Sequence, residues 1–463
     1  MKLRGAALLA MFVAFASLQC RRAEGVSASP VEREAEEALV AYLRIDTTSG
    51  KETAGATYLR DFLRKNGIDA RLVGDDPQRQ GVYARLASGS REPALLLLSH
   101  IDVVPAAAER WRNPPFAATR EGGYIWGRGA LDDKSITIAE VMALLDLKRR
   151  GARLRRDVVL LATPDEERGG LLGAKLLLET RPELFANVGF VLNEGGLSET
   201  AVDRVLYWGI EVQQKVPLWL RVTSEAQGGH GAVAAANGRG APAKLVRALA
   251  AIDQLETPYR ITDTVARVAA LGAKMRNDRR GAALHLIREP LDVARIEREL
   301  APGDRTLLRD TIAITHISAP GAVNVVPSRA VADLDIRLLA GTKPDEMVAR
   351  VREAVGANAT VDVLVAGEPL EETSIDTELY AVLTRVFTAA APGSAVAPMI
   401  SPFTTDSRWF RARGITAYGI APFKVNYYDT DGIHGDNERI RARFFSEGVG
   451  VMRDVVRGFC EVR

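Results

Sequence analysis

The sequence has almost no cysteine, since only Cys20 and Cys460 occur among its 463 residues. This excludes a disulfide framework and a cysteine-rich metal site, so a bound metal ion would have to be held by histidine and carboxylate side chains. The chain also lacks an excess of charge, with 61 basic and 59 acidic residues giving a net charge of +2. That balance does not favour nucleic acid or an anionic membrane as partner, and we expect a small-molecule or peptide substrate.

Several catalytic motifs are absent as well. No Gly-x-Ser-x-Gly segment marks a nucleophilic serine, and no glycine-rich segment ends in the Gly-Lys-Ser or Gly-Lys-Thr of a phosphate loop. The segment "GRGALD" resembles the start of a dinucleotide-binding loop. Its third glycine position is Asp132, however, and that negative charge would oppose a pyrophosphate.

Residues 1–24 have the pattern of a secretion signal. Basic residues precede an apolar stretch from about Ala6 to Leu18, which is too short for an ordinary membrane-spanning helix. Cleavage after Ala16, lipid attachment at Cys20 and an uncleaved N-terminal anchor all remain open. We therefore expect a secreted or periplasmic protein, either free or attached to the membrane by its N-terminus.

The next part of the chain has the pattern of an α/β domain. Amphipathic helices are predicted at 31–45 and 53–66, where apolar residues recur with helical spacing. Short apolar strands then alternate with helices, which is typical of a doubly wound, mostly parallel sheet. We expect residues 30–210 to form the first part of a catalytic domain.

The following residues have a different pattern. Val216, Leu218 and Leu220 fall on one face of a strand whose other face is polar, as in an antiparallel sheet with one solvated side. Strand, helix, strand, strand, helix, strand is a split βαβ order, so we predict an inserted α+β, ferredoxin-like lid or dimerisation domain at 211–366. Residues 367–463 would then return to the first sheet as the second part of the catalytic domain.

Polar side chains follow several predicted strands or open the next helix. They are His100 and Asp102 in "SHID", Asp132 and Asp133 in "GRGALDDKS", Asp165, Glu166 and Glu167 in "TPDEE", and Glu194 in "NEGG". The carboxyl ends of parallel strands meet in one crevice, where so many carboxylates would repel one another unless cations were bound. Imidazole and carboxylate ligands without thiolate suit catalytic zinc, with cobalt or manganese as substitutes.

The local spacing suggests how these residues divide the work. His100 would bind metal through one ring nitrogen, while Asp102, two residues further on and on the same side, could accept a proton from the other nitrogen. Successive side chains of a strand point to opposite sides. We therefore expect one of the adjacent Glu166 and Glu167 to be a ligand and the other a general base.

Seven ordered motifs resemble those of a known enzyme family. They are "SHID", "GRGALDDKS", "TPDEERGG", "NEGG", "GGHGA", "NVVPSRA" and "DGIHGDNERI". In this order and spacing they are similar to the aminoacylase, glutamate carboxypeptidase and succinyl-diaminopimelate desuccinylase family of two-zinc hydrolases. The long form of the second motif and a charged insert at about 256–308 look most like the branch of carboxypeptidase S and the N-fatty-acyl-amino-acid hydrolases.

The resemblance implies a role for each residue of the metal site. The implied metal ligands are Asp132 as the bridge between two ions, His100 and Glu194 on one ion, and Glu167 and His434 on the other. Glu166 would be the general base, and Asp102 would orient the histidine ligand. Because His434 comes from the far end of the chain, the tail has to return to the first sheet.

The resemblance also implies substrate contacts. His230 in "GGHGA" resembles a histidine that stabilises the oxyanion, either in the site of a neighbouring subunit or by closing over its own. Asn324 and Arg337 match positions that hold the substrate carboxylate and carbonyl. Arg408 lies in a segment that resembles part of the pocket lining.

Together these features predict a zinc-dependent metallopeptidase or aminoacylase. It would cleave an amide bond next to a free carboxylate, in a dipeptide, a peptide C-terminus or an N-acyl amino acid. An aminopeptidase or deacetylase with the same metal chemistry is an alternative, although Arg337 favours recognition of a carboxyl group. A binding protein that has lost hydrolysis is a second alternative. The substrate side chain or acyl group, the metal and the oligomeric state stay open.

Overall fold

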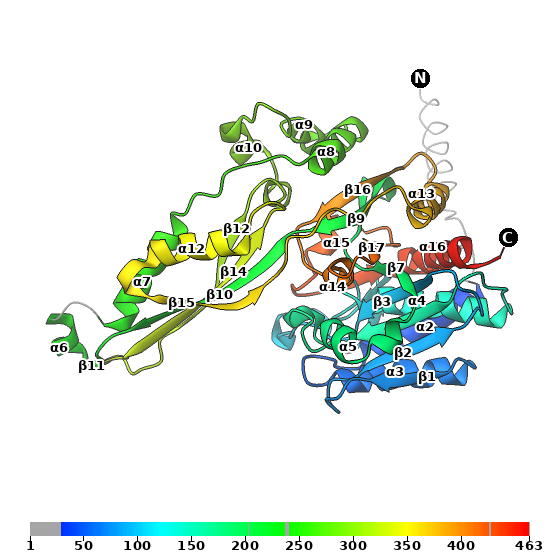
Figure 1. The fold of residues 1–463 in the computed structure, drawn as a ribbon, viewed down its shortest axis with the longest axis horizontal. Helices are drawn as coiled ribbons and strands as arrows, with labels where there is room; N and C mark the ends of the chain where they lie inside the picture. The colour runs from blue at the N-terminus through cyan, green and yellow to red at the C-terminus, as the bar shows by residue number, and fades with distance from the viewer. Residues whose placement is uncertain (1–28, 202, 237–239, 426, 463) are drawn as a thin grey trace, which may run out of the picture.

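The computed structural model describes residues 29–462 apart from 202, 237–239 and 426. The predicted secretion signal lies outside these described residues. Within them, no helix is both long and apolar enough to cross a membrane. Figure 1 shows a helix-covered catalytic domain and an elongated lid domain that extends away from it.

The larger sheet belongs to the catalytic domain. Within the described residues it has nine strands in the order β1-β2-β6-β3-β7-β17-β9-β16, with β8 paired to β9. The strands are β1 (Ala70–Val73), β2 (Gly81–Leu86), β3 (Ala94–His100), β6 (Val158–Thr163), β7 (Val188–Asn193), β8 (Leu197–Ala201), β9 (Arg204–Gln214), β16 (Ala395–Ser401) and β17 (Thr416–Gly419). β3 runs parallel to both of its neighbours, β6 and β7. The apolar run before His100 is therefore a buried strand with parallel neighbours on both sides, in line with the predicted, mostly parallel sheet.

Helices cover both faces of this sheet, because the side chains of its central strands are apolar on both sides. One face carries α2 (Pro30–Leu43), α3 (Glu52–Lys65), α4 (Lys134–Arg149), α13 (Glu378–Ala390) and α16 (Ala442–Cys460). The other face carries α5 (Ala174–Thr180), η3 (Pro182–Phe185) and α14 (Ser407–Arg411). Within β3, Leu95 and Leu97 pack into the first core and Leu96 and Leu98 into the second. This confirms the doubly wound architecture.

The lid domain contains an antiparallel sheet in the order β12-β14-β10-β15. Its elements are β10 (Val216–Glu225), α7 (Ala241–Asp253), β12 (Thr311–Ser318), β14 (Arg329–Leu338), α12 (Pro344–Val355), η4 (Gly356–Asn358) and β15 (Thr360–Ala366). The two α-helices cover one face, where Val216, Leu218 and Leu220 are buried. This is the predicted split βαβ order with the predicted apolar face.

A two-stranded sheet and a short helix form the end of the lid that lies away from the catalytic domain (Figure 1). They consist of β11 (Gly229–His230), which pairs with β13 (Val325–Val326), and of α6 (Gly231–Ala236). The predicted residue His230 therefore lies at the far end of the lid.

The charged insert does not join the core of the lid. It forms α8 (Asp263–Met275), α9 (Arg279–Leu284), α10 (Val293–Glu299) and α11 (Pro302–Thr306). α8, α9 and α10 share a core that includes Ile400 of β16, and Glu199 of β8 forms ion pairs with Arg276 and Arg280. We expected the insert within 211–366, but its apolar faces are buried against the edge of the larger sheet. The predicted domain boundaries themselves stay predictions.

The tail returns to the catalytic domain, as its role in the predicted site requires. β16 and β17 join the larger sheet, while β18 (Arg439–Arg441) pairs with β5 (Tyr124–Trp126), which in turn pairs with β4 (Thr119–Glu121). The remaining short helices are η1 (Ala108–Arg110), η2 (Glu166–Arg168) and α15 (Tyr427–Thr430). The β18–β5 pairing places the loop before β18 beside the loop after β5.

Candidate active site

The carboxyl ends of neighbouring parallel strands bring most of the predicted site residues together. His100 is the last residue of β3, and Glu194 directly follows β7. Glu166 and Glu167 lie in η2, just after β6. Asp132 reaches the same place from the loop before α4. The crevice at the carboxyl edge of a doubly wound sheet is where such folds bind ligands.

Asp132 lies between two histidines. Its Oδ1 is 3.0 Å from Nε2 of His100, and its Oδ2 is 3.2 Å from Nε2 of His434. The same nitrogen of His434 is 2.9 Å from Oε2 of Glu167, while that of His100 is 3.7 Å from Oε1 of Glu194. The five residues predicted as ligands thus form two sets that share Asp132.

The donor atoms fit a centre of two metal ions. Two groups, His100 with Glu166 and Glu194 and His100 with Asp132 and Glu167, have potential ligand atoms within 4.8 Å of one another. Imidazole nitrogen and carboxylate oxygen are ligands that zinc, cobalt and manganese accept. A carboxylate whose two oxygens face two different histidines is suited to bridge two ions. The ligand roles themselves stay predictions.

The electrostatics of the cluster also fit bound cations. Burial raises the pKa of Glu166 and of Glu194 well above the ordinary value. Burial opposes the ionisation of Asp132 as well, but hydrogen bonds with the two histidines hold its pKa below its usual range. Hydrogen bonds with Asp132 and Glu167 raise the pKa of His434 to about 10. Without metal, the protein therefore keeps protons on these groups, and divalent cations would displace the protons.

Asp102 contacts His100 in a different way from the one expected. Nδ1 of His100 donates to the main-chain oxygen of Asp102 at 2.8 Å, whereas the nearest carboxylate oxygen is 3.7 Å away. The two carboxylate oxygens accept hydrogen bonds from the main-chain nitrogens of Glu166 and Glu167, each at 3.1 Å. The carbonyl therefore fixes the tautomer, leaving Nε2 free for a metal, and the carboxylate holds the segment with the predicted base.

The two adjacent glutamates follow a turn and lie together in the short helix η2, not on a strand. β6 ends at Thr163, and Asp165 has a positive φ of 75°, after which η2 begins. The carboxylate of Asp165 accepts hydrogen bonds from Arg79 at 2.5 Å and from the main-chain nitrogen of Leu172 at 2.8 Å. The division into one ligand and one base stays a prediction, but strand alternation is not its physical reason, because both glutamates lie in η2.

Two arginines lie near the crevice. Arg337 lies on the lid face opposite the helices, and donates to both carboxylate oxygens of Asp335 at 2.7 and 3.1 Å and to Oγ1 of Thr404 at 2.6 Å. Arg408 in α14 is buried and donates to the main-chain oxygen of Gly169 at 2.5 Å. Burial lowers the pKa of Arg408, and the nearby Arg337 lowers it further. The two guanidinium groups together place positive charge beside the predicted base, Glu166.

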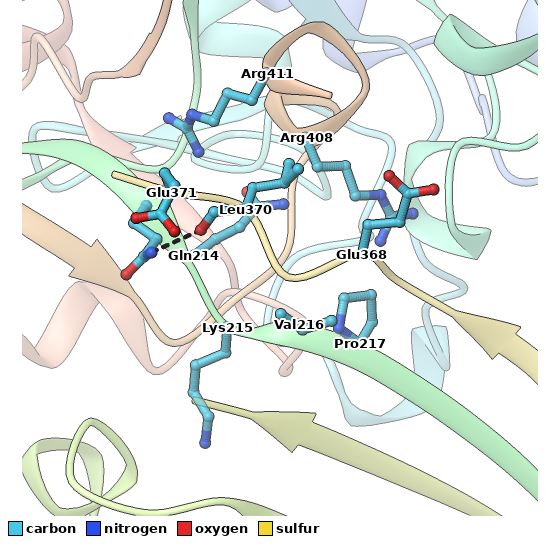
Figure 2. Close-up of a pocket in the computed structure, with 10 residues that line it drawn as sticks. Gln214, Lys215, Val216, Pro217, Glu368, Leu370, Glu371, Arg408 and Arg411 are labelled. Atoms are coloured by element: carbon cyan, nitrogen blue, oxygen red, sulfur yellow. Dashed lines mark hydrogen bonds between the residues drawn. The ribbon is translucent and has the colours of Figure 1, made fainter. Parts of the chain in front are cut away.

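A small cavity lies where the chain crosses between the two domains (Figure 2). Its lining residues are Gln213, Gln214, Lys215, Val216, Pro217, Glu368, Leu370, Glu371, Arg408 and Arg411. Lys215 is the single residue between β9 and β10, and its ammonium group donates to the main-chain oxygens of Thr306 and Arg309 at 3.0 and 2.9 Å. The cavity is part of this crossing and is separate from the metal-ligand cluster.

His230 and Asn324 lie together, but far from this cluster. The main-chain nitrogen of Gly231 donates to the main-chain oxygen of Asn324 at 2.8 Å, and both predicted residues are exposed. Arg337 lies near the opposite end of β14, a strand of ten residues. Such a strand is about 30 Å long at the usual rise per residue. Within one chain, the structure therefore does not bring His230 and Asn324 to the metal ligands (Figure 1).

Sequence reasoning missed the residues that support the predicted ones. Asp335 and Thr404 hold Arg337, and Glu438 holds the loop of Asp132. Glu438 lies in the motif "DGIHGDNERI", four residues after His434. The motif therefore contained this residue, but its supporting role depends on contacts between distant parts of the chain.

The fold and the site define a metal-dependent hydrolase with an α/β catalytic domain and an inserted lid. The chain belongs to the peptidase family M20/M25/M40, whose family model matches residues 96–458. This confirms the resemblance found in the sequence and makes the protein a hydrolase of the metallopeptidase and aminoacylase type.

Two related proteins align with most of the chain. The N-fatty-acyl-amino acid synthase/hydrolase PM20D1 of Xenopus tropicalis is 30% identical over 427 residues, which cover 87% of this chain and 81% of that protein. Aminoacylase-1 of Sus scrofa is 28% identical over 433 residues, covering 91% and 94% of the two chains. Among solved structures, the metallo-carboxypeptidase Sso-CP2 of Sulfolobus solfataricus matches with a TM-score of 0.72 and 20% identity over 92% of this chain and 98% of that one. The last match shows the shared fold.

Proposed function

We propose that the protein is a two-zinc hydrolase that releases an amino acid with a free carboxylate from an N-acyl amino acid, a dipeptide or a peptide C-terminus. The observation that carries this proposal is the placement of Asp132 between His100 and His434, next to the paired glutamates and the two arginines. The metal ligands would be His100, Asp132, Glu167, Glu194 and His434. Bound zinc would lower the pKa of a water molecule and polarise the scissile carbonyl.

Glu166 is the proposed general base. Its main-chain nitrogen is anchored on the carboxylate of Asp102, and its side chain lies with those of His100 and Glu194. Burial raises its pKa well above the ordinary value in the metal-free protein, and bound cations would oppose this shift and leave a carboxylate that can accept a proton. It would take a proton from the attacking water and pass it to the leaving amine.

Arg337 and Arg408 are the proposed recognition groups for the substrate carboxylate. A guanidinium can bind a carboxylate with two parallel hydrogen bonds, which a lysine cannot. In this structure Asp335 and Thr404 orient Arg337, and Asp335 also accepts a hydrogen bond from Nε1 of Trp219 at 3.1 Å. These contacts favour an acid-bearing substrate over the free amine that an aminopeptidase recognises.

The active form is proposed to be a homodimer through the lid domain. His230 and Asn324 sit at the exposed end of the lid, next to the exposed apolar side chains of Val323 and Val325. A second subunit could place its own His230 and Asn324 over the metal ligands of the first. His230 would then donate to the oxyanion, and Asn324 would hold the substrate from the partner's side.

We also propose secretion or a periplasmic location, supported by the signal-like pattern of residues 1–24. Fractionation of the producing cells would test this, because the activity should be found outside the cytoplasm. Membrane attachment by the N-terminus would place it in the membrane fraction instead.

The proposed reaction is tested by amino-acid release from a panel of dipeptides and of N-acyl amino acids with short and long acyl chains. The chain-length series is chosen because the two named relatives are an aminoacylase and an N-fatty-acyl-amino acid synthase/hydrolase. Zinc-loaded protein should release the amino acid from at least one member of the panel. If two zinc ions are bound per chain and no amino acid is released, the result favours the aminopeptidase, deacetylase or binding-protein alternatives.

A further inference from the structure

Glu438 is a buried carboxylate beside the candidate metal site with no part in the proposed chemistry. Its exposed fraction is 0%, and both of its oxygens accept two hydrogen bonds each. Oε1 accepts from the main-chain nitrogens of Leu131 and Asp132 at 2.7 and 3.1 Å. Oε2 accepts from the main-chain nitrogen of Gly129 at 2.9 Å and from Nη1 of Arg128 at 2.7 Å. One side chain thus fixes the whole loop that presents Asp132.

Arg128 connects the same carboxylate to the loop of the other histidine. It is 2% exposed, and its Nη2 donates to the main-chain oxygen of Gly435 at 2.7 Å. Its Nη1 also donates to the main-chain oxygen of Gly432 at 3.4 Å, and its guanidinium lies over the ring of Trp111 at 5.1 Å. The backbone on both sides of His434 is therefore held by the group that neutralises Glu438.

His434 depends on this support more than the other predicted ligands do. Its side chain is 56% exposed, and its backbone has a positive φ of 57°. By contrast, His100 is 2% exposed at the end of a central strand. A half-exposed side chain on a loop is ordered mainly by what holds the loop.

We propose that Glu438, together with Arg128, is a positioning residue that holds Asp132 and His434 in the placement needed by the metal ion they share with Glu167. This inference rests on the proposed two-metal function. It predicts an asymmetry, because Asp132 would serve both ions whereas His434 would serve only the ion shared with Glu167. The other ion keeps His100 and Glu194, which lie at strand ends that Glu438 does not touch. Weakening the Glu438 contacts should therefore affect one metal site much more than the other.

The test is a zinc titration of metal-free protein against a chromophoric chelator, comparing wild type with Glu438→Gln. Glutamine keeps the size of the side chain but loses the charge and turns one acceptor into a donor that faces main-chain N–H groups. We expect two tightly bound ions in the wild type. In the variant, one ion should bind at least about tenfold more weakly, the size of effect typical for lost supporting contacts at metal sites, and the other should lose clearly less affinity. Excess zinc should restore turnover with an unchanged KM.

Asp157→Asn is the matched control. Asp157 also accepts hydrogen bonds from an arginine, Nε of Arg85 at 2.8 Å, and from the main-chain nitrogen of Ser88 at 2.7 Å. It precedes β6 at the end of the sheet opposite Glu166, so its loss should leave both zinc affinities unchanged. If Glu438→Gln does not fold, Arg128→Lys takes its place. The guanidinium of Arg128 contacts Glu438 and Gly435 with two different nitrogens, and a lysine has only one nitrogen to offer.

Two results would overturn the inference. One is wild-type affinity for both ions in a folded Glu438 or Arg128 variant, and the other is an equal loss at both sites. The titration needs no substrate, so it separates this inference from the proposed reaction. If the wild type binds two ions but hydrolyses no amide, the proposed reaction is wrong and the role of Glu438 can still be tested. If the wild type binds fewer than two ions, both proposals are wrong.

Discussion

The crevice of the catalytic domain and the far end of the lid are built in opposite ways. In the crevice, His100 and Asp102 are almost completely buried, and each contacts residues from other strand ends. At the end of the lid, His230 and Asn324 are exposed, and the two short strands β11 and β13 and a hydrogen bond from the start of α6 hold their backbone.

The difference fits the proposed division of the site between two subunits. The groups proposed to hold metal are collected by a parallel sheet within one chain, where burial makes their interactions strong. The groups proposed to complete the substrate site lie at the far end of the lid, away from the crevice of their own chain (Figure 1). The comparison therefore predicts a metal centre that one chain can assemble and a substrate site that needs two.

The largest expected effect comes from removing the proposed base in the crevice. Glu166→Ala should lower kcat by roughly 100- to 10,000-fold, the usual contribution of a general base. Metal analysis should still find two ions per chain, because the five predicted ligands remain. Turnover close to wild type in this variant would contradict the assignment of Glu166.

The next effect tests the lid. His230→Ala should lower kcat by roughly 100- to 1,000-fold, as expected for the loss of an oxyanion donor, with unchanged metal content. His316→Ala is the control, because that histidine is also on the lid but contacts Asp333.

Mixing two inactive proteins sharpens this test of the lid. A dimer of one Glu166→Ala subunit and one His230→Ala subunit has one crevice with both groups if His230 acts on the partner. Co-purified mixed dimers should therefore regain part of the wild-type activity. No recovery in dimers that contain both subunits would show that His230 acts within its own chain or not at all.

A smaller effect is expected where the lid meets the crevice. Arg337→Lys keeps the charge but loses the two-pronged geometry, and we expect KM to rise about 10- to 100-fold with little change in kcat. Arg221→Lys is the control, since Arg221 makes a similar pair with Asp333, at 2.7 and 3.0 Å, on the same lid strands. Equal KM changes in both variants would assign the effect to lid stability and not to substrate binding.

The smallest effect concerns metal removal and pH. In the metal-free protein Glu194 has a raised pKa because of burial, and His434 a pKa raised to about 10 by its carboxylate partners. Both groups hold more protons in the folded than in the unfolded state, so their contributions to stability are lost as pH rises. Zinc binds better as its ligands lose protons. Tm of the metal-free protein should fall between pH 6 and 9 while the gap to the zinc-loaded protein widens, and a constant gap would contradict this.

The sequence was sufficient for the fold and for the strand-end residues, because both depend on local patterns. Short apolar strands that alternate with helices predicted the doubly wound sheet, and the alternation at Val216, Leu218 and Leu220 predicted a sheet with one covered face. These patterns follow from side-chain periodicity alone.

The parts that could not be predicted depend on contacts between distant segments. The carboxylate of Asp102 caps η2 and not the ring of His100, because η2 turns toward it after β6. The helices at 263–306 pack against Ile400 and not on the lid core, since the edge of β16 offers them an apolar partner. Glu438 acts on a loop from the other end of the chain, which its spacing from His434 alone does not reveal.

The central claim is hydrolysis of an amide bond next to a free carboxylate by a metal centre that one chain assembles. The most direct test compares an N-acyl amino acid with the same compound carrying a terminal carboxamide, using zinc-loaded protein and the Glu166→Ala variant. We predict release from the acid, kcat/KM lower by about tenfold or more for the carboxamide because a charge-assisted pair is lost, and release by the variant slower by roughly 100-fold or more. Equal rates for the two compounds, or release by the variant at close to the wild-type rate, would contradict the account.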